Sequence, residues 1–404
     1  MARPTVMLLA FLIAAAGAGS APATVQPRPR APVTIPFELV NQHVLVKAHV
    51  KNSRPLWFVL DTGANVAIVR TDTAKELGLS LEGTVSTGGA GSGRQAGQRV
   101  KDAKWSLAGL EAFSQPITLA LPFPLLPAGL GTAVDGIVGG EFIKEFVLEL
   151  DYQTRRITLH DRGTFKYEGP GEILPLEFNA DGHPVVKARV TPVGGGAIEH
   201  KFHVDIGSGL ALTLHSPFVT EHNLLGPGTK TIHAVGLAGA GGQSFGRYGR
   251  VSALQIGSFT INNPITLFSQ DNGGAFANRT LAGNIGAQTQ RRFRTFFDYG
   301  RKRMILEPSP AFAEPFDRAF VGIAVRAEGS DFRTFRVREV AENLPGAEAG
   351  IKEGDVITSV DGMGADKLTL TTLHDALDKE GPHEVTIRRG DETLKIMVMS
   401  KRVI

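Results

Sequence analysis

Apolar and polar positions alternate in two similar stretches of the chain, residues 43–50 (HVLVKAHV) and residues 183–190 (HPVVKARV). Alternation with a period of two is typical of a β-strand with one buried face. A second apolar run follows each stretch and ends at an aspartate, in residues 57–64 (WFVLDTGA) and residues 201–208 (KFHVDIGS). The pattern predicts two strand pairs, of which one ends at Asp61 and the other at Asp205.

The order of these blocks continues in parallel after both aspartates. Each copy has a short helical stretch, then a segment that ends in glycine, then a polar turn with an apolar run: residues 71–79, 135–139 and 151–159 in the first copy, and residues 216–225, 282–286 and 298–306 in the second. Their recurrence indicates an internal repeat over residues 33–308. Because each copy has the size of a small domain, the repeat predicts two β lobes related by a pseudo-two-fold axis. A site on that axis receives one aspartate from each lobe.

Composition narrows the class of protein. Glycine supplies 48 of the 404 residues and aromatic residues 7%, which favours a mainly β protein with many turns. The net charge is +3 without a run of basic residues, so a nucleic-acid partner is not expected. The chain has no cysteine, which excludes disulfides and cysteine-ligated zinc. His200 and His203 have no accompanying ligand set, so neither a metal nor another cofactor is predicted.

The N-terminus has the pattern of an export signal. Arg3 precedes an apolar run over residues 6–16, and small residues continue to Ala23. Residues 1–23 are therefore predicted to be a signal peptide and residues 24–36 a proline-rich leader or linker; a retained membrane anchor is the alternative. The expectation is an exported bacterial protein, periplasmic or extracellular, with no membrane span after signal cleavage.

As a pair, the two aspartates could carry out general acid–base chemistry. Gly63 and Gly207 permit a sharp turn after each strand. Two such turns on one axis would bring the carboxyl groups together, and two like charges at that distance share one proton. The ionised carboxylate can then take a proton from water while the protonated one polarises an amide carbonyl. In the alternative reading, both aspartates only cap turns.

Asp61, Thr62, Gly63 and Ala64, after an apolar strand and followed later by residues 137–139 (IVG), resemble the aspartic protease family. The resemblance covers both repeats and has pepsin-like features, two lobes in one chain, and retropepsin-like features, the Asp-Thr-Gly-Ala motif. It implies a pepsin-like fold with an N-terminal lobe over residues 37–165 and a C-terminal lobe over residues 172–308. It further implies an endopeptidase for peptides or unfolded proteins, with catalytic Asp61 and Asp205, no metal, and all parts present in a monomer.

The second motif departs from the family pattern. In the family, a hydroxyl residue after each aspartate forms a hydrogen bond across the axis; Thr62 can do so and Ile206 cannot. Ser208 is expected to compensate by a hydrogen bond to the Asp205 carboxylate. His203 lies two residues before Asp205 on the same strand face, where it either packs as an ordinary strand residue or stabilises the ionised aspartate. Because of Ile206, a peptide-binding pseudoprotease remains the alternative function.

Glycine-rich segments occur at corresponding places in the two copies, residues 88–93 and residues 236–242. Gly88, Gly89 and Gly91 are candidate flap residues that would cover a substrate. The alternative is a pair of flexible hairpin tips.

The last part of the chain resembles a PDZ domain of the kind found in bacterial proteases. Residues 335–351 (FRVREVAENLPGAEAGI) and residues 352–362 (KEGDVITSVDG) carry the resemblance, which implies a PDZ-like domain over residues 318–402 after a linker at residues 309–317. A helix at about residues 370–377 would flank a peptide groove, with Gly322, Ile323 and Ala324 as the candidate peptide-binding loop. Such domains bind peptides by strand addition, which gives substrate recruitment or regulation. A purely structural, lobe-docking role is the alternative.

Overall fold

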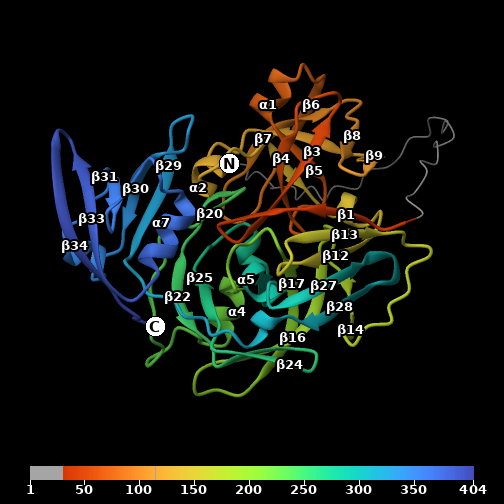
Figure 1. The fold of residues 1–404 in the computed structure, drawn as a ribbon. Helices are drawn as coiled ribbons and strands as arrows, with labels where there is room; N and C mark the ends of the chain where they lie inside the picture. Colours follow the sequence, from red (N-terminus) through yellow and green to blue (C-terminus); the bar gives the residue numbers. More distant parts are fainter. Residues whose placement is uncertain (1–30, 114) are drawn as a thin grey trace, which may run out of the picture.

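The computed structural model describes residues 31–113 and 115–404. The predicted signal peptide and residues 24–30 of the predicted leader lie outside this range. Figure 1 shows an N-terminal lobe in red to yellow, a C-terminal lobe in green to cyan, and a blue C-terminal domain at the side of both.

The N-terminal lobe is built on one large sheet with the strand order β6-β7-β10-β5-β11-β4-β3-β8-β9, and β2 pairs with β3. Its strands are β2 (Glu38–Val40), β3 (His43–Val50), β4 (Leu56–Leu60), β5 (Ala67–Arg70), β6 (Leu81–Thr87), β7 (Gln95–Val100), β8 (Trp105–Leu107), β9 (Leu110–Phe113), β10 (Thr118–Leu121) and β11 (Gly136–Val138). Three short helices complete it: α1 (Thr71–Glu76), α2 (Leu126–Leu130) and α3 (Gly140–Ile143).

The C-terminal lobe repeats this sheet strand for strand, with the order β19-β22-β25-β18-β26-β17-β16-β23-β24 and β15 paired with β16. Its strands are β15 (Glu177–Phe178), β16 (Pro184–Thr191), β17 (Ile198–Asp205), β18 (Leu212–Leu214), β19 (Ile232–His233), β22 (Gly246–Arg250), β23 (Ala253–Ile256), β24 (Phe259–Asn262), β25 (Ile265–Ser269) and β26 (Gly283–Gly286). The helices are α4 (Ser216–Glu221), η1 (Ala275–Ala277) and α5 (Ala287–Gln290), and a small hairpin consists of β20 (Ala238–Gly239) and β21 (Gly242–Gln243). The repeat predicted from the sequence is confirmed.

A six-stranded sheet joins the lobes in the order β1-β13-β12-β27-β28-β14. Its strands are β1 (Val33–Pro36), β12 (Val147–Asp151), β13 (Arg156–His160), β14 (Glu172–Pro175), β27 (Phe293–Asp298) and β28 (Arg303–Pro308), with η2 (Tyr299–Arg301) between the last two of the C-terminal lobe. The central pair β12–β27 relates the halves, so β1 corresponds to β14. The predicted leader is therefore wrong for residues 33–36: Ile35 pairs with Ile157 and is 3% exposed, because its side chain enters the core beneath the sheet.

The C-terminal domain has the sheet order β29-β30-β31-β33-β34, with β32 on β31. It contains β29 (Ile323–Glu328), β30 (Thr334–Val340), β31 (Val356–Val360), β32 (Met363–Gly364), β33 (Gly381–Arg389), β34 (Glu392–Ser400), α6 (Pro345–Glu348) and α7 (Leu370–Leu377). α7 has the predicted bounds because Thr369 caps it, accepting a hydrogen bond from the Thr372 N–H. Phe335, Leu373 and Val385 belong to a separate buried core of this domain. In the part of the chain that the structure describes, every helix is too short or too polar to cross a membrane.

The predicted linker, residues 309–317, is held against the C-terminal lobe. It contains η3 (Pro310–Ala313). The buried Arg292 guanidinium donates hydrogen bonds of 3.0 Å to the Ala311 carbonyl and 3.1 Å to the Phe312 carbonyl. Phe312 also contacts the Phe293 ring. The segment packs against the lobe because a buried guanidinium needs acceptors and residues 311 and 312 supply them.

Candidate active site

The two aspartates end equivalent central strands. Asp61 directly follows β4, which runs parallel to β11, and its N–H donates to the Val138 carbonyl at 2.9 Å. Asp205 is the last residue of β17 and is paired in parallel with Gly286 of β26. The strands fix both backbones, so the carboxyl groups project from the same kind of junction in each lobe.

Asp61 and Asp205 are joined by a side-chain hydrogen bond. The glycines of the two turns make this approach possible. A Cβ atom on Gly207 would lie 2.1 Å from Asp61 Oδ1, and a Cβ atom on Gly63 would lie 2.8 Å from Asp205 Oδ1. Each glycine therefore faces the aspartate of the other lobe. A side chain at either position would collide with that aspartate.

The pair holds a proton near neutral pH. Burial is the largest cause, followed by the negative charge of Asp205; together they raise the pKa of Asp61 to about 8. The Gly63 N–H, 2.6 Å from Asp61 Oδ1, and the Gly207 backbone act in the opposite direction. Asp61 is thus protonated near neutral pH.

The Thr62 hydroxyl forms two hydrogen bonds across the axis. It donates to the Val204 carbonyl at 2.6 Å and accepts from the Ile206 N–H at 2.9 Å. Ile206 has no hydroxyl and cannot form the equivalent hydrogen bonds to the N-terminal lobe. Its side chain is completely buried in the core.

Asn284 makes the hydrogen bond that the sequence analysis assigned to Ser208. The Asn284 amide donates to Asp205 Oδ2 at 2.7 Å, and its own Oδ1 lies 2.9 Å from His215 Nε2. Among the described residues no hydrogen bond joins the Ser208 hydroxyl to Asp205, so that expectation is wrong. Asn284 lies on β26 beside β17, and this register places its amide against Asp205.

The sequence contained a signal for Asn284. In the second copy, residues 282–286 read AGNIG where the first copy has DGIVG, so a polar amide replaces an apolar residue in a central strand. A buried polar side chain needs a partner, and the carboxylate two residues along the neighbouring strand provides one.

Three histidines lie within electrostatic range of Asp205. Burial lowers the pKa of His43, His183 and His203, and the Asp205 charge only partly opposes this. The pKa of His183 falls to about 4, and its ring stacks on His203 with 5.1 Å between centroids. His203 is thus a buried, neutral ring at pH 7. No cluster of metal-ligating side chains occurs within residues 31–113 and 115–404.

The candidate flap residues lie in a direct connection between the lobes, named here the glycine bridge (residues 88–95 with residues 238–243). The Gly93 N–H donates to the Gly241 carbonyl and the Gly241 N–H to the Ala90 carbonyl, both at 2.8 Å. A Cβ atom at Gly89 would lie 2.8 Å from Ala240 Cβ, and one at Gly91 would lie 2.8 Å from the Gly241 carbonyl. Gly88 lies at the edge of this contact. The two loops of the sequence repeat therefore meet tip to tip.

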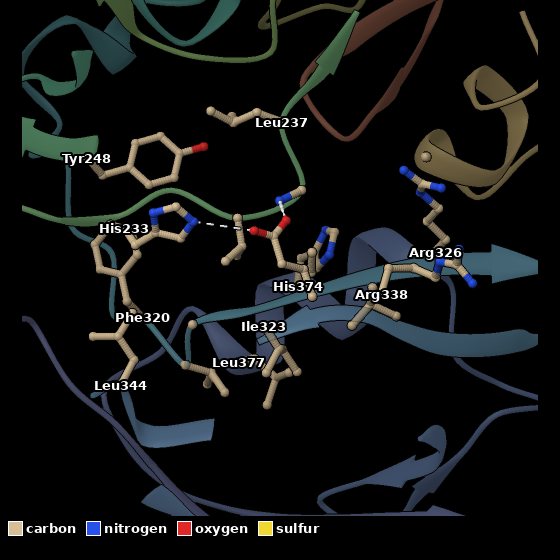
Figure 2. A pocket seen from close by; sticks show the side chains of 18 of the residues that line it. His233, Leu237, Tyr248, Phe320, Ile323, Arg326, Arg338, Leu344, His374 and Leu377 are labelled. Atoms are coloured by element: carbon tan, nitrogen blue, oxygen red, sulfur yellow. Dashed lines mark hydrogen bonds and ion pairs between the residues drawn. The ribbon is translucent and has the colours of Figure 1, made fainter. Parts of the chain in front are cut away.

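The candidate peptide-binding loop of the C-terminal domain faces the two lobes. Gly322, Ile323 and Ala324 line a cavity of about 500 Å³. Figure 2 shows this cavity, with Ile323 and Leu377 on one side and His233 and Leu237 of the C-terminal lobe on the other.

The fold and the site define a two-lobed, aspartic-protease-like β protein followed by a PDZ domain. Residues 46–142 match the family model described as aspartyl protease, and residues 319–399 match the family model of PDZ domains.

Sequence comparison finds proteins that are similar to a short segment of the chain. The chain is 38% identical over 65 residues to the serine protease HTRA1 of Xenopus laevis, which is 16% of this chain and 14% of that protein. The Xenopus tropicalis protein of the same name is 39% identical over 66 residues, with the same two shares. The chain thus spans only a small fraction of the length of these relatives.

Three solved structures resemble parts of the chain. Soybean basic 7S globulin is 11% identical, with 70% of this chain and 96% of that chain covered and a TM-score of 0.43. The aspartic proteinase of Irpex lacteus is 15% identical, with 70% and 99% covered and a TM-score of 0.43. The HtrA3 PDZ domain bound to a phage-derived ligand (FGRWV) is 27% identical, with 21% and 86% covered and a TM-score of 0.19.

Proposed function

We propose that this protein is an aspartic endopeptidase that hydrolyses peptide bonds of exported proteins. The observation that carries the proposal is the hydrogen-bonded pair of Asp61 and Asp205, one from each lobe, which retains a proton because the pKa of Asp61 is raised to about 8. A structural turn cap has no need of a carboxyl partner from the other half of the chain.

The pair supports general acid–base hydrolysis without a covalent intermediate. Ionised Asp205 takes a proton from a water molecule, and the water oxygen attacks the carbonyl carbon of the scissile peptide bond. Asp61 gives its proton to the carbonyl oxygen, which leaves a neutral tetrahedral diol. Collapse of the diol breaks the C–N bond, and the proton now on Asp205 goes to the leaving amine. Asp61 regains its proton from the diol.

Other parts of the chain support the proposed substrate and location. An extended, unfolded segment presents its peptide bonds to a site between two lobes, and the glycine bridge would have to open for it to enter. The PDZ domain would recruit peptides by strand addition to the edge of its sheet. The export pattern in residues 1–23 supports action in the periplasm or outside the cell.

A peptide-binding pseudoprotease is the second candidate, and Ile206 favours it. Among the described residues, only the Thr62 hydroxyl forms hydrogen bonds across the axis at the two turns, so the carboxyl groups are held with fewer constraints than a symmetric pair would provide. Small misplacements of reacting groups reduce turnover steeply.

The test is cleavage of a permanently unfolded protein by the full chain after signal removal, from pH 3 to pH 8. We expect fragments from the wild type and none from Asp61→Asn or Asp205→Asn, with all three proteins equally folded by circular dichroism. Cleavage that is unaffected by either substitution would contradict the mechanism. Tight binding of a peptide with a hydroxyethylene group at the scissile position, without cleavage of any substrate, would establish the pseudoprotease. Export is tested by cell fractionation and N-terminal sequencing of the mature chain.

A further inference from the structure

The peptide groove of the PDZ domain, between β29 and α7, is partly filled by the N-terminal lobe. Gly131 ends helix α2 with a φ of 71°, and a Cβ atom there would lie 2.5 Å from Leu370 Cβ and 3.5 Å from Ala327 Cβ. Leu370 begins α7 and Ala327 lies in β29, so the end of α2 is seated between the two walls of the groove. A peptide strand added along all of β29 would compete with α2 for this space.

The other end of the groove is covered by the C-terminal lobe. A Cβ atom on Gly236 would lie 2.8 Å from Ala324 Cβ. Glu339 of β30 accepts a hydrogen bond from the Gly236 N–H at 2.8 Å, and its other carboxylate oxygen lies 3.4 Å from His233 Nε2 (Figure 2). The polar groups of this contact are exposed, and solvated ion pairs stabilise by only about 1 kcal/mol or less. This polar contact alone therefore adds little to the docking, which also has an apolar part where Phe320 and Leu344 pack with the core of the lobes.

The segment held by Glu339 leads directly into the glycine bridge. β20 begins at Ala238, two residues after Gly236, and the Ser244 N–H closes the base of the hairpin on the Leu237 carbonyl at 3.1 Å. The tip of this hairpin is Gly241, which exchanges backbone hydrogen bonds with the loop of the N-terminal lobe. The PDZ domain thus holds the base of the hairpin whose tip joins the two lobes.

The charges in the cavity indicate what could displace the lobes. Arg326 and Arg338 lie side by side at one rim (Figure 2). Arg326 makes no hydrogen bond or ion pair with any described side chain, and the nearest carboxylate to Arg338, that of Glu328, is 3.9 Å away. Burial and the Arg338 charge lower the pKa of Arg326. In contrast, Arg318, which also lines the cavity, is paired with Asp378 at 3.0 Å. Two neighbouring, poorly compensated guanidinium groups fit acidic side chains.

We propose that this groove is a regulatory site for an acidic peptide, which competes with α2 and with residues 232–238 for the PDZ domain and thereby loosens the glycine bridge. Acidic side chains of the ligand pair with Arg326 and Arg338, and its backbone adds to β29. Release of Gly236 from Glu339 frees the base of the hairpin, so that the lobes can separate. The effect on cleavage rests on the proposed function, whereas binding and bridge opening do not.

Ligand binding is tested with two fluorescein-labelled decapeptides, one with glutamate at alternate positions and one with glutamine in their place. The full chain carries Asp61→Asn, so that the probe is not cut. We expect the glutamate peptide to bind at least tenfold more tightly than the glutamine peptide, and Arg326→Ala and Arg338→Ala each to lose fivefold or more. Arg388→Ala, at an exposed arginine elsewhere on the domain, is the matched control and leaves binding unchanged. Equal affinity for the two peptides overturns the proposed ligand.

Competition is tested by loosening the docking. Gly131→Ala places a methyl group against Leu370, and Glu339→Ala removes the acceptor of the Gly236 N–H. Both variants are expected to bind even the glutamine peptide at least threefold more tightly, an effect that the lost charge of Glu339 cannot explain. Glu339→Gln keeps a carbonyl acceptor for Gly236 and is expected to stay closer to the wild type. If Gly131→Ala does not fold, the two Glu339 variants still decide the point; unchanged affinity in Glu339→Ala overturns competition.

Bridge opening is measured by amide hydrogen exchange. A saturating glutamate peptide should accelerate exchange in residues 238–243 and 89–93 and slow it in β29. Binding without faster exchange in the bridge overturns the regulatory inference. With the wild-type dyad, the peptide should raise cleavage of an unfolded protein severalfold. Faster exchange without any cleavage contradicts the proposed function and leaves the binding site in place.

Discussion

The Asn284 amide donates a hydrogen bond of 2.7 Å to Asp205 Oδ2, the carboxylate oxygen that is not directed at Gly63. An N–H donor stabilises the ionised form of a carboxylate. Because the first lobe has Ile137 in the corresponding place, only one of the two aspartates receives this stabilisation. In the proposed mechanism, this asymmetry favours Asp205 as the base and Asp61 as the acid.

Replacement of Asn284 by leucine should therefore lower kcat by about 10- to 100-fold, since about 1.5–3 kcal/mol is typical of a hydrogen bond to a charged group. KM should change little, because the hydrogen bond lost is one to the Asp205 carboxylate and not one to the substrate. Ser208→Ala is the matched control and should keep kcat within about threefold. Equal losses in the two variants would show that the turn, and not the amide, holds Asp205.

Thr62→Val should destabilise the protein by about 2–4 kcal/mol, because both the Val204 carbonyl and the Ile206 N–H would lose their partner in a buried place. The measurement is urea unfolding at fixed pH. Thr62→Ser retains the hydroxyl and should cost about 1 kcal/mol at most. A valine variant as stable as the serine variant would contradict a role for these hydrogen bonds.

Gly207→Ala should abolish cleavage, because its methyl group would lie 2.1 Å from Asp61 Oδ1 and would push the carboxyl groups apart. The expected loss is at least about 100-fold, in line with the sensitivity of catalysis to small displacements. Gly196→Ala, where no heavy atom lies within 4 Å of the added methyl group, is the control. Retained activity in Gly207→Ala would contradict the close approach of the two turns.

The rate of cleavage should fall as the pH rises through about 8, because Asp61 then loses the proton that the mechanism uses. At the acid end, activity should be lost when the pair takes up a second proton, because no carboxylate then remains to act as the base. The pH dependence of kcat/KM measures both limits for the free enzyme. An alkaline limit near pH 4 to 5 would contradict the raised pKa of Asp61.

The free energy of unfolding should also depend on the proton that Asp61 holds. The pKa of Asp61 is about 8 in the folded chain and 3.8 when unperturbed, so the folded state binds more protons between these values. Its contribution to stability is complete below about pH 4 and is lost as the pH rises toward 8. The unfolding free energy of Asp61→Asn relative to the wild type should thus rise by at least about 1 kcal/mol from pH 4 to pH 8. The buried histidines are common to both proteins and cancel in this difference; a flat difference would contradict the shared proton.

The sequence itself determined the large features of the fold. The period-two pattern, the repeated blocks and the run at residues 335–362 predicted two β lobes and a PDZ-like domain, and α7 has the predicted bounds. The strand-then-glycine context singled out Asp61 and Asp205. These features are local or repeated, so neighbouring residues and the second copy carry the information.

Contacts between residues far apart in the chain were decided only by the tertiary structure. Asn284 rather than Ser208 supports Asp205 because the register of β17 and β26 brings the amide to the carboxylate. β1 becomes an edge strand through its pairing with β13, although the proline-rich composition of residues 24–36 had predicted a leader there. The seating of α2 in the PDZ groove depends on the docking of two domains. Local periodicity reports which face of an element is buried, but not the partner that buries it.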